Sequence, residues 1–327
     1  MTQYVYFFGD GKAEGKGISK ETLGGKGAGL AEMTAIGIPV PPGFTITTEA
    51  CDAYFKGGNQ WPGGLADEVE GNVRKIEASM GQGFGGGDKP LLVSVRSGAA
   101  ISMPGMMDTI LNLGLTDGTV EALAKATNNE RMAFDSYRRL IEMFGGVVMG
   151  VDRKHFEHHM DAMKHRVGAK SDVELNAAHL RELANDYKGI YQKHVGKPFP
   201  QDAREQLRAA IEAVFRSWNN DRAKAYRAKN RVTGLKGTGV NVQAMVFGNW
   251  GDTSGTGVGF TRNPGNGEKV FMAEYLFNAQ GEDVVAGTRT PVHLDDLKAR
   301  QPEVYEQILQ TFATLETHYK DMQDTEF

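Results

Sequence analysis

The segment from Ser94 to Thr109 combines an arginine with glycines, hydroxyl side chains and methionines, a set of residues suited to anion binding. Arg96 follows the apolar run at 91–95, so we expect it to leave a buried strand and enter a loop. A guanidinium offers a planar fork of N–H donors for phosphate oxygens, and small neighbours let backbone amides approach the same anion. The segment predicts a phosphate site. The alternative is an ordinary strand-to-helix connection with methionine as filler.

A second candidate is the glycine run Gly24–Gly29, which carries Lys26 ahead of an expected helix with Leu30, Met33 and Ile36 on one face. No Ser or Thr follows the lysine as in a P-loop, and the run does not fit the dinucleotide fingerprint. It offers a lysine in a flexible turn near a helix N-terminus, where backbone N–H groups can meet an anion. A plain turn with a solvated lysine is the alternative.

Two acidic pairs lie towards the end of the chain, and the second of them could hold a metal ion. Glu282 and Asp283 form an acidic pair on an expected loop, after a glycine-rich strand that ends beside Arg262. Asp324 and Glu326 are two residues apart, so on a strand they would share one face. Two carboxylates on one face suit Mg²⁺ beside nucleotide phosphates, because Mg²⁺ prefers hard oxygen ligands. A solvated sheet edge is the alternative.

The histidines at 155, 158, 159 and 165 recur at spacings that share one helix face, which is a possible metal-binding pattern. Charged residues alternate with them, so a solvated helix surface is the favoured interpretation. Cys51 is the only cysteine, which excludes a disulfide framework and a multi-thiolate metal site. We expect it to be a small core residue.

Composition narrows the class of protein further. The 327 residues include 37 Lys and Arg against 41 Asp and Glu, and the net charge of −4 argues against nucleic-acid binding. No apolar run reaches the roughly 18–20 residues of a membrane helix, and the N-terminus does not read as a signal peptide. The sequence therefore predicts a soluble cytoplasmic protein. Its 42 glycines gather in clusters, where backbone must approach something closely.

Hydrophobic periodicity places these residues on an α+β fold, with a helical insertion at 114–197. We expect strands over residues 3–8, 43–46, 91–95, 240–247, 256–261 and 269–277. We expect helices over residues 30–36, 48–55 (with Thr48 as N-cap), 131–144, 152–167, 173–194, 202–227 and 295–320.

Taken together, these stretches resemble the N-terminal nucleotide-binding domain of the pyruvate phosphate dikinases over essentially the whole chain. The most specific stretch is Ser94–Gly114. The resemblance implies an ATP-grasp fold, in which two lobes close on the nucleotide. The implied first lobe covers 1–113 and 198–243, the inserted helical subdomain covers 114–197, and the second lobe covers 244–327, cut short at its C-terminal strand.

In that family the β-phosphoryl group of ATP passes to a histidine on a separate swivelling domain. Inorganic phosphate takes the γ-phosphoryl group, AMP and pyrophosphate leave, and a barrel domain then phosphorylates pyruvate. The resemblance implies that Lys26 and Arg96 clamp the phosphates and are the catalytic residues, and that Asp324 and Glu326 act through Mg²⁺. The residues implied to bind the nucleotide are Lys26, Arg96, Gly98, Met103, Gly105, Asp108, Gln243, Met245, Thr256, Arg262, Glu282 and Asp283.

The chain also departs from the family pattern. It stops after Asp324-Thr325-Glu326-Phe327, before the Gln-x-Arg motif of the next strand, and it lacks the phosphoacceptor histidine in its Thr-Cys-His context and the pyruvate-binding barrel. We therefore expect one module of a larger, homodimeric enzyme, unable to complete the reaction alone. The alternatives are a nucleotide domain of the phosphoenolpyruvate synthase type, which uses water as second acceptor, and a non-catalytic nucleotide-binding module.

Overall fold

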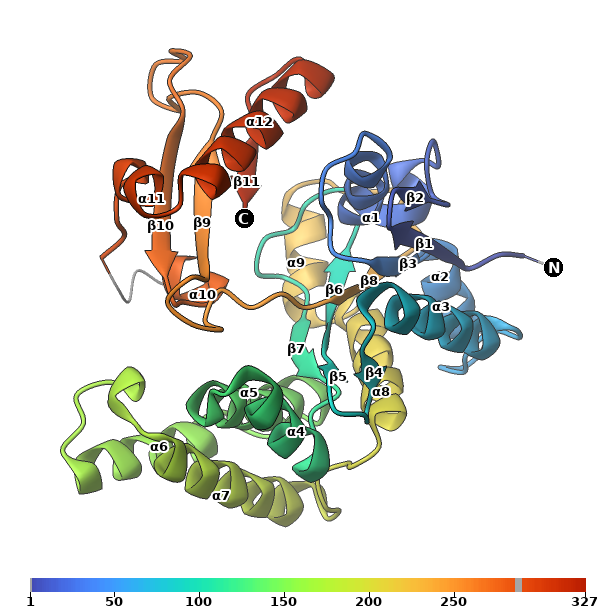
Figure 1. Ribbon diagram of the computed structural model, residues 1–327. Helices are drawn as coiled ribbons and strands as arrows, with labels where there is room; N and C mark the ends of the chain where they lie inside the picture. The colour runs from blue at the N-terminus through green and yellow to red at the C-terminus, as the bar shows by residue number, and fades with distance from the viewer. Residues whose placement is uncertain (1, 286–289) are drawn as a thin grey trace. The chain divides into compact units, whose positions relative to one another are not determined.

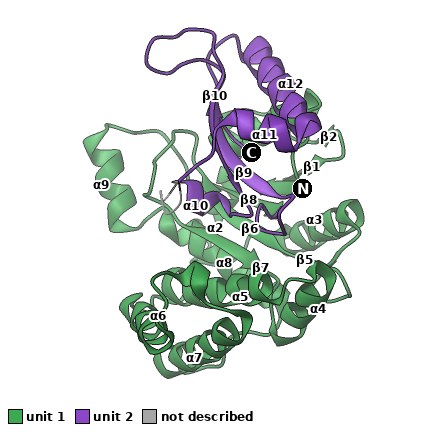
Figure 2. Cartoon of the chain, turned by 60° about the vertical axis from the view of Figure 1, so that its left-hand side comes forward, with its two compact units in different colours: residues 1–245 green, residues 246–327 purple. Residues whose placement is uncertain are grey.

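The computed structural model describes residues 2–285 and 290–327, and the chain divides into two compact units, residues 1–245 and 246–327 (Figure 2). Both units combine helices with β-sheet, so the expected α+β class is confirmed. The finer division at residues 113, 197 and 243 stays a prediction.

Unit 1 is built on a six-stranded sheet with the order β2-β1-β3-β8-β6-β7, in which all neighbours are antiparallel. The strand β8 comes last in the sequence and lies between β3 and β6 (Figure 1). The strands of this sheet are β1 (Val5–Gly9), β2 (Lys12–Ala13), β3 (Gly43–Ile46), β6 (Val93–Gly98), β7 (Thr109–Leu113) and β8 (Gly239–Ala244). Two short strands, β4 (Gly83–Phe84) and β5 (Pro90–Leu91), pair in parallel elsewhere in unit 1.

Helices make up most of the rest of unit 1, and α4 to α7 follow one another between β7 and α8 (Figure 1). The α-helices are α1 (Lys20–Ala35), α2 (Thr48–Lys56), α3 (Leu65–Met80), α4 (Asp117–Thr127), α5 (Glu130–Met143), α6 (Lys154–Val167), α7 (Ala177–Val195), α8 (Ala203–Ser217) and α9 (Asp221–Lys229). A π-helical turn η1 (Phe144–Val148) and a 3-10 turn η2 (Asp172–Glu174) complete the set.

The two faces of the six-stranded sheet differ in polarity, because side chains alternate along each strand. Val95 and Val242 are paired on one face and fully buried. Arg96 and Asn241 are paired on the other. Helix α1 covers this polar face, since a side-chain carbon at Gly27 would meet Asn241. The glycine-rich helix therefore lies directly on the polar side chains of the sheet.

Capping side chains explain two of the helix boundaries in unit 1 that differ from the expected ones. The expected helix over 202–227 is two helices, because Asn220 caps α9 by accepting from the backbone N–H of Ala223 at 2.7 Å. Helix α2 is capped by Thr47 and not by Thr48, since the Thr47 hydroxyl accepts from the backbone N–H of Ala50.

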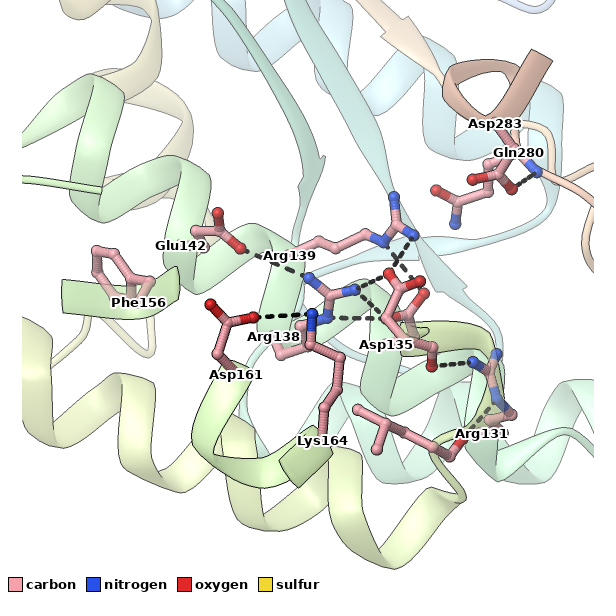
Figure 3. Close-up of polar contacts among 12 residues, drawn as sticks. Arg131, Asp135, Arg138, Arg139, Glu142, Phe156, Asp161, Lys164, Gln280 and Asp283 are labelled. Carbon is pink, nitrogen blue, oxygen red and sulfur yellow. Dashed lines mark hydrogen bonds and ion pairs between the residues drawn. The ribbon is translucent and has the colours of Figure 1, made fainter. Parts of the chain in front are cut away.

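A buried ion-pair network joins α5 to η2 (Figure 3). Asp135 is 5% exposed and accepts from Nε of Arg138 at 2.8 Å and from Nε of Arg139 at 3.1 Å. Arg138 also donates to Asp172 at 3.0 Å. Burial raises the pKa of Asp135, but Arg138, Arg139 and Arg131 together outweigh it and hold that pKa below its usual value. The network keeps Asp135 charged inside the helical part of unit 1.

Unit 2 is a three-stranded antiparallel sheet packed against helices. Its strand order is β10-β9-β11, and Phe312 and Phe327 meet in its core with ring centroids 6.0 Å apart. The expected helix over 295–320 is two helices, since Pro302 begins the second. The elements are β9 (Gly255–Phe260), β10 (Met272–Phe277), β11 (Asp324–Glu326), α10 (Gly281–Val285), α11 (Leu294–Arg300) and α12 (Pro302–Tyr319).

Within residues 2–285 and 290–327, no helix is both long and apolar enough to cross a membrane.

Candidate functional site

The glycine run expected to form a turn is part of helix α1, so that expectation is wrong. Helical geometry breaks only at Gly24, whose φ is 73°. The absence of a side chain allows Gly24 to lie against the carbonyl oxygen of Gly98, and the Gly25 N–H donates to the Ala99 carbonyl at 2.9 Å. The first turns of α1 are therefore fastened to the end of β6.

Lys26 lies beside this junction. It is exposed on α1, and a side-chain carbon at Gly98 would be 3.4 Å from the Lys26 Cβ. The structure thus brings together two residues that the sequence placed in separate motifs, the lysine of the glycine run and the glycine after Arg96.

Arg96 lies inside β6 and not in the loop expected for it. Residues 93–98 pair along their whole length with β8, so the strand continues past the arginine to Gly98. Arg96 is partly exposed, but its Nε is buried and has no hydrogen-bond partner among the described residues. A buried donor without an acceptor is costly, so it fits a site that receives an anion. This atom supports the phosphate interpretation of Arg96.

The loop after β6 is anchored to α9 and to the residue that caps this helix. Met103 is buried at 6% exposure, and Gly105 has a φ of 70° that favours glycine. Asp108 pairs with Arg222 of α9, with 3.4 Å between the carboxylate and the guanidinium. Burial raises the pKa of Asp108, while Arg222 lowers it. Asn220 holds the loop by donating to the Met106 carbonyl at 3.1 Å.

Gln243 and Met245 lie at the end of β8. Gln243 is paired with Ser94, and its side chain donates to the Pro41 carbonyl at 3.0 Å. The backbone N–H of Met245 donates to the Leu92 carbonyl at 2.9 Å. The end of β8 is therefore hydrogen-bonded both to the segment at Pro41, before β3, and to the segment at Leu92, before β6.

In unit 2, three of the expected nucleotide-binding side chains have partners within that unit. Thr256 donates to the Phe327 carbonyl at 3.0 Å. Arg262 pairs with Glu316 at 2.8 Å, and the pKa of Glu316 is lowered, first by its hydrogen bond with Thr261 and then by Arg262. Asp283 accepts from the backbone N–H of Gln280 at 2.9 Å (Figure 3). The side chain of the expected residue Glu282 lies outside the described part of the structure.

Asp324 and Glu326 stand on the same face of β11, as their spacing predicted. Asp324 is paired with Phe260 and Glu326 with Val258, and both carboxylates are exposed. Within residues 2–285 and 290–327, no cluster of three His, Cys, Asp or Glu side chains forms a metal site. The pair fits Mg²⁺ that keeps several waters and shares phosphate oxygens, since that ion is held by one or two carboxylates in such sites.

The histidine-rich helix face is a solvated groove, in agreement with the favoured interpretation. His155 of α6 stacks on His194 of α7 with ring centroids 4.1 Å apart. These rings, with His158 and Lys193, line an open hollow of about 530 Å³. Burial, His155 and Lys193 lower the pKa of His194.

Sequence reasoning missed two residues of the polar sheet face, Thr45 and Asn241. Their side chains are hydrogen-bonded to each other at 2.8 Å, and Asn241 lies opposite Arg96 in the sheet. The period-two pattern of β8 could have revealed Asn241, because it places that residue on the same face as Gln243.

Comparisons with known proteins point to one family. The family model described as "Pyruvate phosphate dikinase, AMP/ATP-binding domain" matches residues 20–61 and 59–308. "Pyruvate, phosphate dikinase 2" of Zea mays is 54% identical over 326 residues, which is 100% of this chain and 37% of the maize protein. The chloroplastic "Pyruvate, phosphate dikinase 1" of Arabidopsis thaliana is 55% identical over 323 residues, covering 99% of this chain and 33% of that protein. The chain thus spans about a third of the length of these relatives.

Proposed function

The chain belongs to the pyruvate phosphate dikinase AMP/ATP-binding domain family, and on this premise we propose that it binds ATP with Mg²⁺ as the nucleotide-binding module of such an enzyme. One observation carries the proposal. Arg96, whose buried Nε has no partner within residues 2–285 and 290–327, lies on the sheet face that α1 covers, and Lys26 stands beside Gly98 at the end of the same strand. Two positively charged side chains, one on α1 and one on β6, thus lie at the same region of the sheet. Several phosphate oxygens can be bound only where more than one such donor is present.

The proposed fold is an ATP-grasp fold. Its first lobe covers residues 1–113 and 198–243, its inserted helical subdomain 114–197, and its second lobe 244–327. Two features support this division: the helices α4 to α7 follow one another between β7 and α8, and the compact units separate at Met245.

Each proposed role follows from the chemistry of the side chain. Lys26 and Arg96 neutralise phosphate charge, and Gly98 leaves room for close approach. Asp324 and Glu326 would hold Mg²⁺, which supplies further charge neutralisation at the phosphates. The segment 243–246 would border the adenine. The remaining proposed nucleotide contacts are Met103, Gly105, Asp108, Thr256, Arg262, Glu282 and Asp283.

The activity of a whole dikinase is a further proposal, because this chain spans only a third of its relatives' length. We propose that the β-phosphoryl group of ATP moves to a histidine of a separate swivelling domain while inorganic phosphate takes the γ-phosphoryl group. The products are a phosphohistidine, AMP and pyrophosphate. A pyruvate-binding barrel, a homodimeric parent and a cytoplasmic location complete the proposal.

Calorimetric titration of this chain with ATP and Mg²⁺ tests the binding. We expect saturable binding to the unchanged chain and a loss of about 100-fold in affinity for Arg96→Ala, since a charged donor to a phosphate is worth about 3 kcal/mol. Arg74→Ala is the matched control, because Arg74 is an exposed arginine that pairs with Glu70 on α3. Arg74→Ala should bind ATP like the unchanged chain.

Two outcomes would contradict the proposal. The unchanged chain could fail to bind ATP under conditions in which its circular dichroism shows a folded protein. Alternatively, Arg96→Ala and Arg74→Ala could bind equally well, which would remove Arg96 from the site.

A further inference from the structure

Asn241 is a buried polar residue in the middle of the six-stranded sheet, and it is 2% exposed. It is paired with Thr45 on β3 and with Arg96 on β6. Its Oδ1 accepts from the Thr45 hydroxyl at 2.8 Å, whereas its Nδ2 has no hydrogen-bond partner among the described residues. The amide oxygen of Asn241 is therefore held by a hydrogen bond, whereas its amide nitrogen has a donor that no described residue uses.

Asn241 is paired with a residue that carries a second unused donor. Nε of Arg96 is also buried without a partner in the described part of the chain. Paired residues of antiparallel strands have Cβ atoms about 4.5–5.5 Å apart on the same face. Leaving one buried donor unpaired costs about 1–3 kcal/mol, so two such donors on paired residues call for a common explanation.

The Asn241 amide lies where α1 meets the end of β6. A side-chain carbon at Gly98 would be 2.7 Å from Nδ2 of Asn241 and 3.4 Å from Cβ of Lys26. One at Gly27 would be 3.1 Å from Oδ1 of Asn241. The amide therefore stands against Gly98, beside the lysine proposed to bind phosphate.

We propose that Nδ2 of Asn241 and Nε of Arg96 form a two-donor subsite for one phosphoryl oxygen of the nucleotide, and that Thr45 is the positioning residue that fixes the amide. This inference rests on the proposed ATP binding. Both donors carry hydrogen and neither can accept, so the subsite takes an anionic oxygen and rejects a cation. The Thr45 hydroxyl donates to Oδ1, so the NH₂ group is turned towards Gly98.

Asn241→Asp tests the subsite with the smallest change in shape. It replaces the donor by an acceptor and adds a negative charge that can pair with Arg96. We expect affinity for ATP and for inorganic tripolyphosphate to fall about tenfold or more, since a hydrogen bond to a charged group is lost. Affinity for adenosine, which carries no phosphate, should not change. Asn72→Asp is the control, because Asn72 is another buried asparagine, placed on α3.

A second pair of variants tests the positioning role and decides the question if Asn241→Asp does not fold. Thr45→Val removes the hydroxyl that orients the amide and should weaken tripolyphosphate binding. Thr45→Ser retains a hydroxyl and should restore it. Adenosine binding should be equal in both variants. A role in packing alone would not separate the two ligands in this way.

The outcomes separate this inference from the proposed function. If the unchanged chain binds neither ATP nor tripolyphosphate, ATP binding itself is contradicted. If the unchanged chain binds ATP and Asn241→Asp binds tripolyphosphate equally well, or if its affinities for ATP and adenosine fall together, only the subsite is contradicted. Tighter binding by Asn241→Asp would show that an acceptor belongs opposite Arg96, and would likewise overturn it.

Discussion

The backbone of Gly24 lies against the carbonyl oxygen of Gly98, so closely that a side-chain carbon at position 24 would overlap that oxygen. Gly24 also has a φ of 73°, which favours glycine. The junction between α1 and β6 thus depends on a glycine for two independent reasons, conformation and space.

We expect Gly24→Ala to lower the free energy of unfolding by about 3 kcal/mol, since a positive φ costs 1–2 kcal/mol and backbone must also move. It should also weaken ATP binding, because Lys26 shares this turn. Urea denaturation and calorimetry measure the two effects. Gly29→Ala is the control: no atom of another segment lies within 4 Å of its Cβ position. It should be neutral or stabilising, by up to about 1 kcal/mol. Equal stability of the two variants would show that the Gly24 contact does not constrain the fold.

Asp135→Asn should destabilise unit 1 by about 3 kcal/mol at pH 7, because it removes the carboxylate that pairs with buried Arg138 and half-buried Arg139 (Figure 3). Asp161→Asn removes a carboxylate that pairs with Lys164. The Asp161 side chain is 71% exposed, so this change should cost less than about 1 kcal/mol. Urea denaturation of both variants measures the difference.

The pKa of Asp135 gives the same interaction a pH dependence. That pKa is lower in the folded state than the unfolded value of about 3.9, so its contribution is complete above that pH and is lost as pH falls through the folded pKa. The stability difference between Asp135→Asn and the unchanged chain should therefore shrink below about pH 4. A difference that stays constant from pH 7 to pH 3 would refute this assignment.

The acidic pair on β11 should set the Mg²⁺ dependence of ATP binding. In the double variant Asp324→Asn, Glu326→Gln we expect affinity for ATP with Mg²⁺ to fall to the value measured in EDTA. The physical reason is that amides do not supply the anionic oxygens that Mg²⁺ requires. Asp321→Asn, an exposed carboxylate outside β11, should retain the full Mg²⁺ effect. Retention of that effect in the double variant would remove the pair from the metal site.

His194 should titrate below the usual value of about 6.5, because burial, His155 and Lys193 all disfavour its charged form. Removal of the stacked ring in His155→Ala should raise the pKa of His194 part of the way back. His158→Ala changes the same groove without touching the stack, and should leave that pKa unchanged. NMR titration of the His194 ring protons measures all three proteins. A shift in His158→Ala as large as that in His155→Ala would argue against the stack as a cause.

Local sequence pattern correctly predicted the helices and strands in which apolar residues recur at a regular spacing. The alternation in β8 and β9 and the long helices α5, α6 and α7 agree with expectation, because each has a continuous face to bury. Helix α1 was not predicted at its full length, since glycines disfavour a helix locally and only packing against Gly98 and Thr45 explains them. Arg96 was misplaced for a similar reason: its pairing partner in β8 is far away in the sequence.

The residues of the candidate site also fall into two groups, those that the sequence could identify and those that it could not. Lys26 and Arg96 could be named from residue type and resemblance, since their charge is the signal. Asn241 and Thr45 are neutral, and their hydrogen bond spans 196 positions, so no local pattern identifies it. The sequence could not show which residues of the site contact one another, because those contacts form only in the folded chain.

The central place of β8 has a consequence for synthesis on the ribosome. β3 and β6 are made early but become neighbours of β8 only after residues 239–244 emerge. Until then, each half of the sheet presents an open edge, and such edges pair readily with other chains. A nascent chain that stalls while α4 to α9 are being made would therefore depend on chaperones to shield the edges of β3 and β6. Once β8 has emerged, this single strand pairs with both edges.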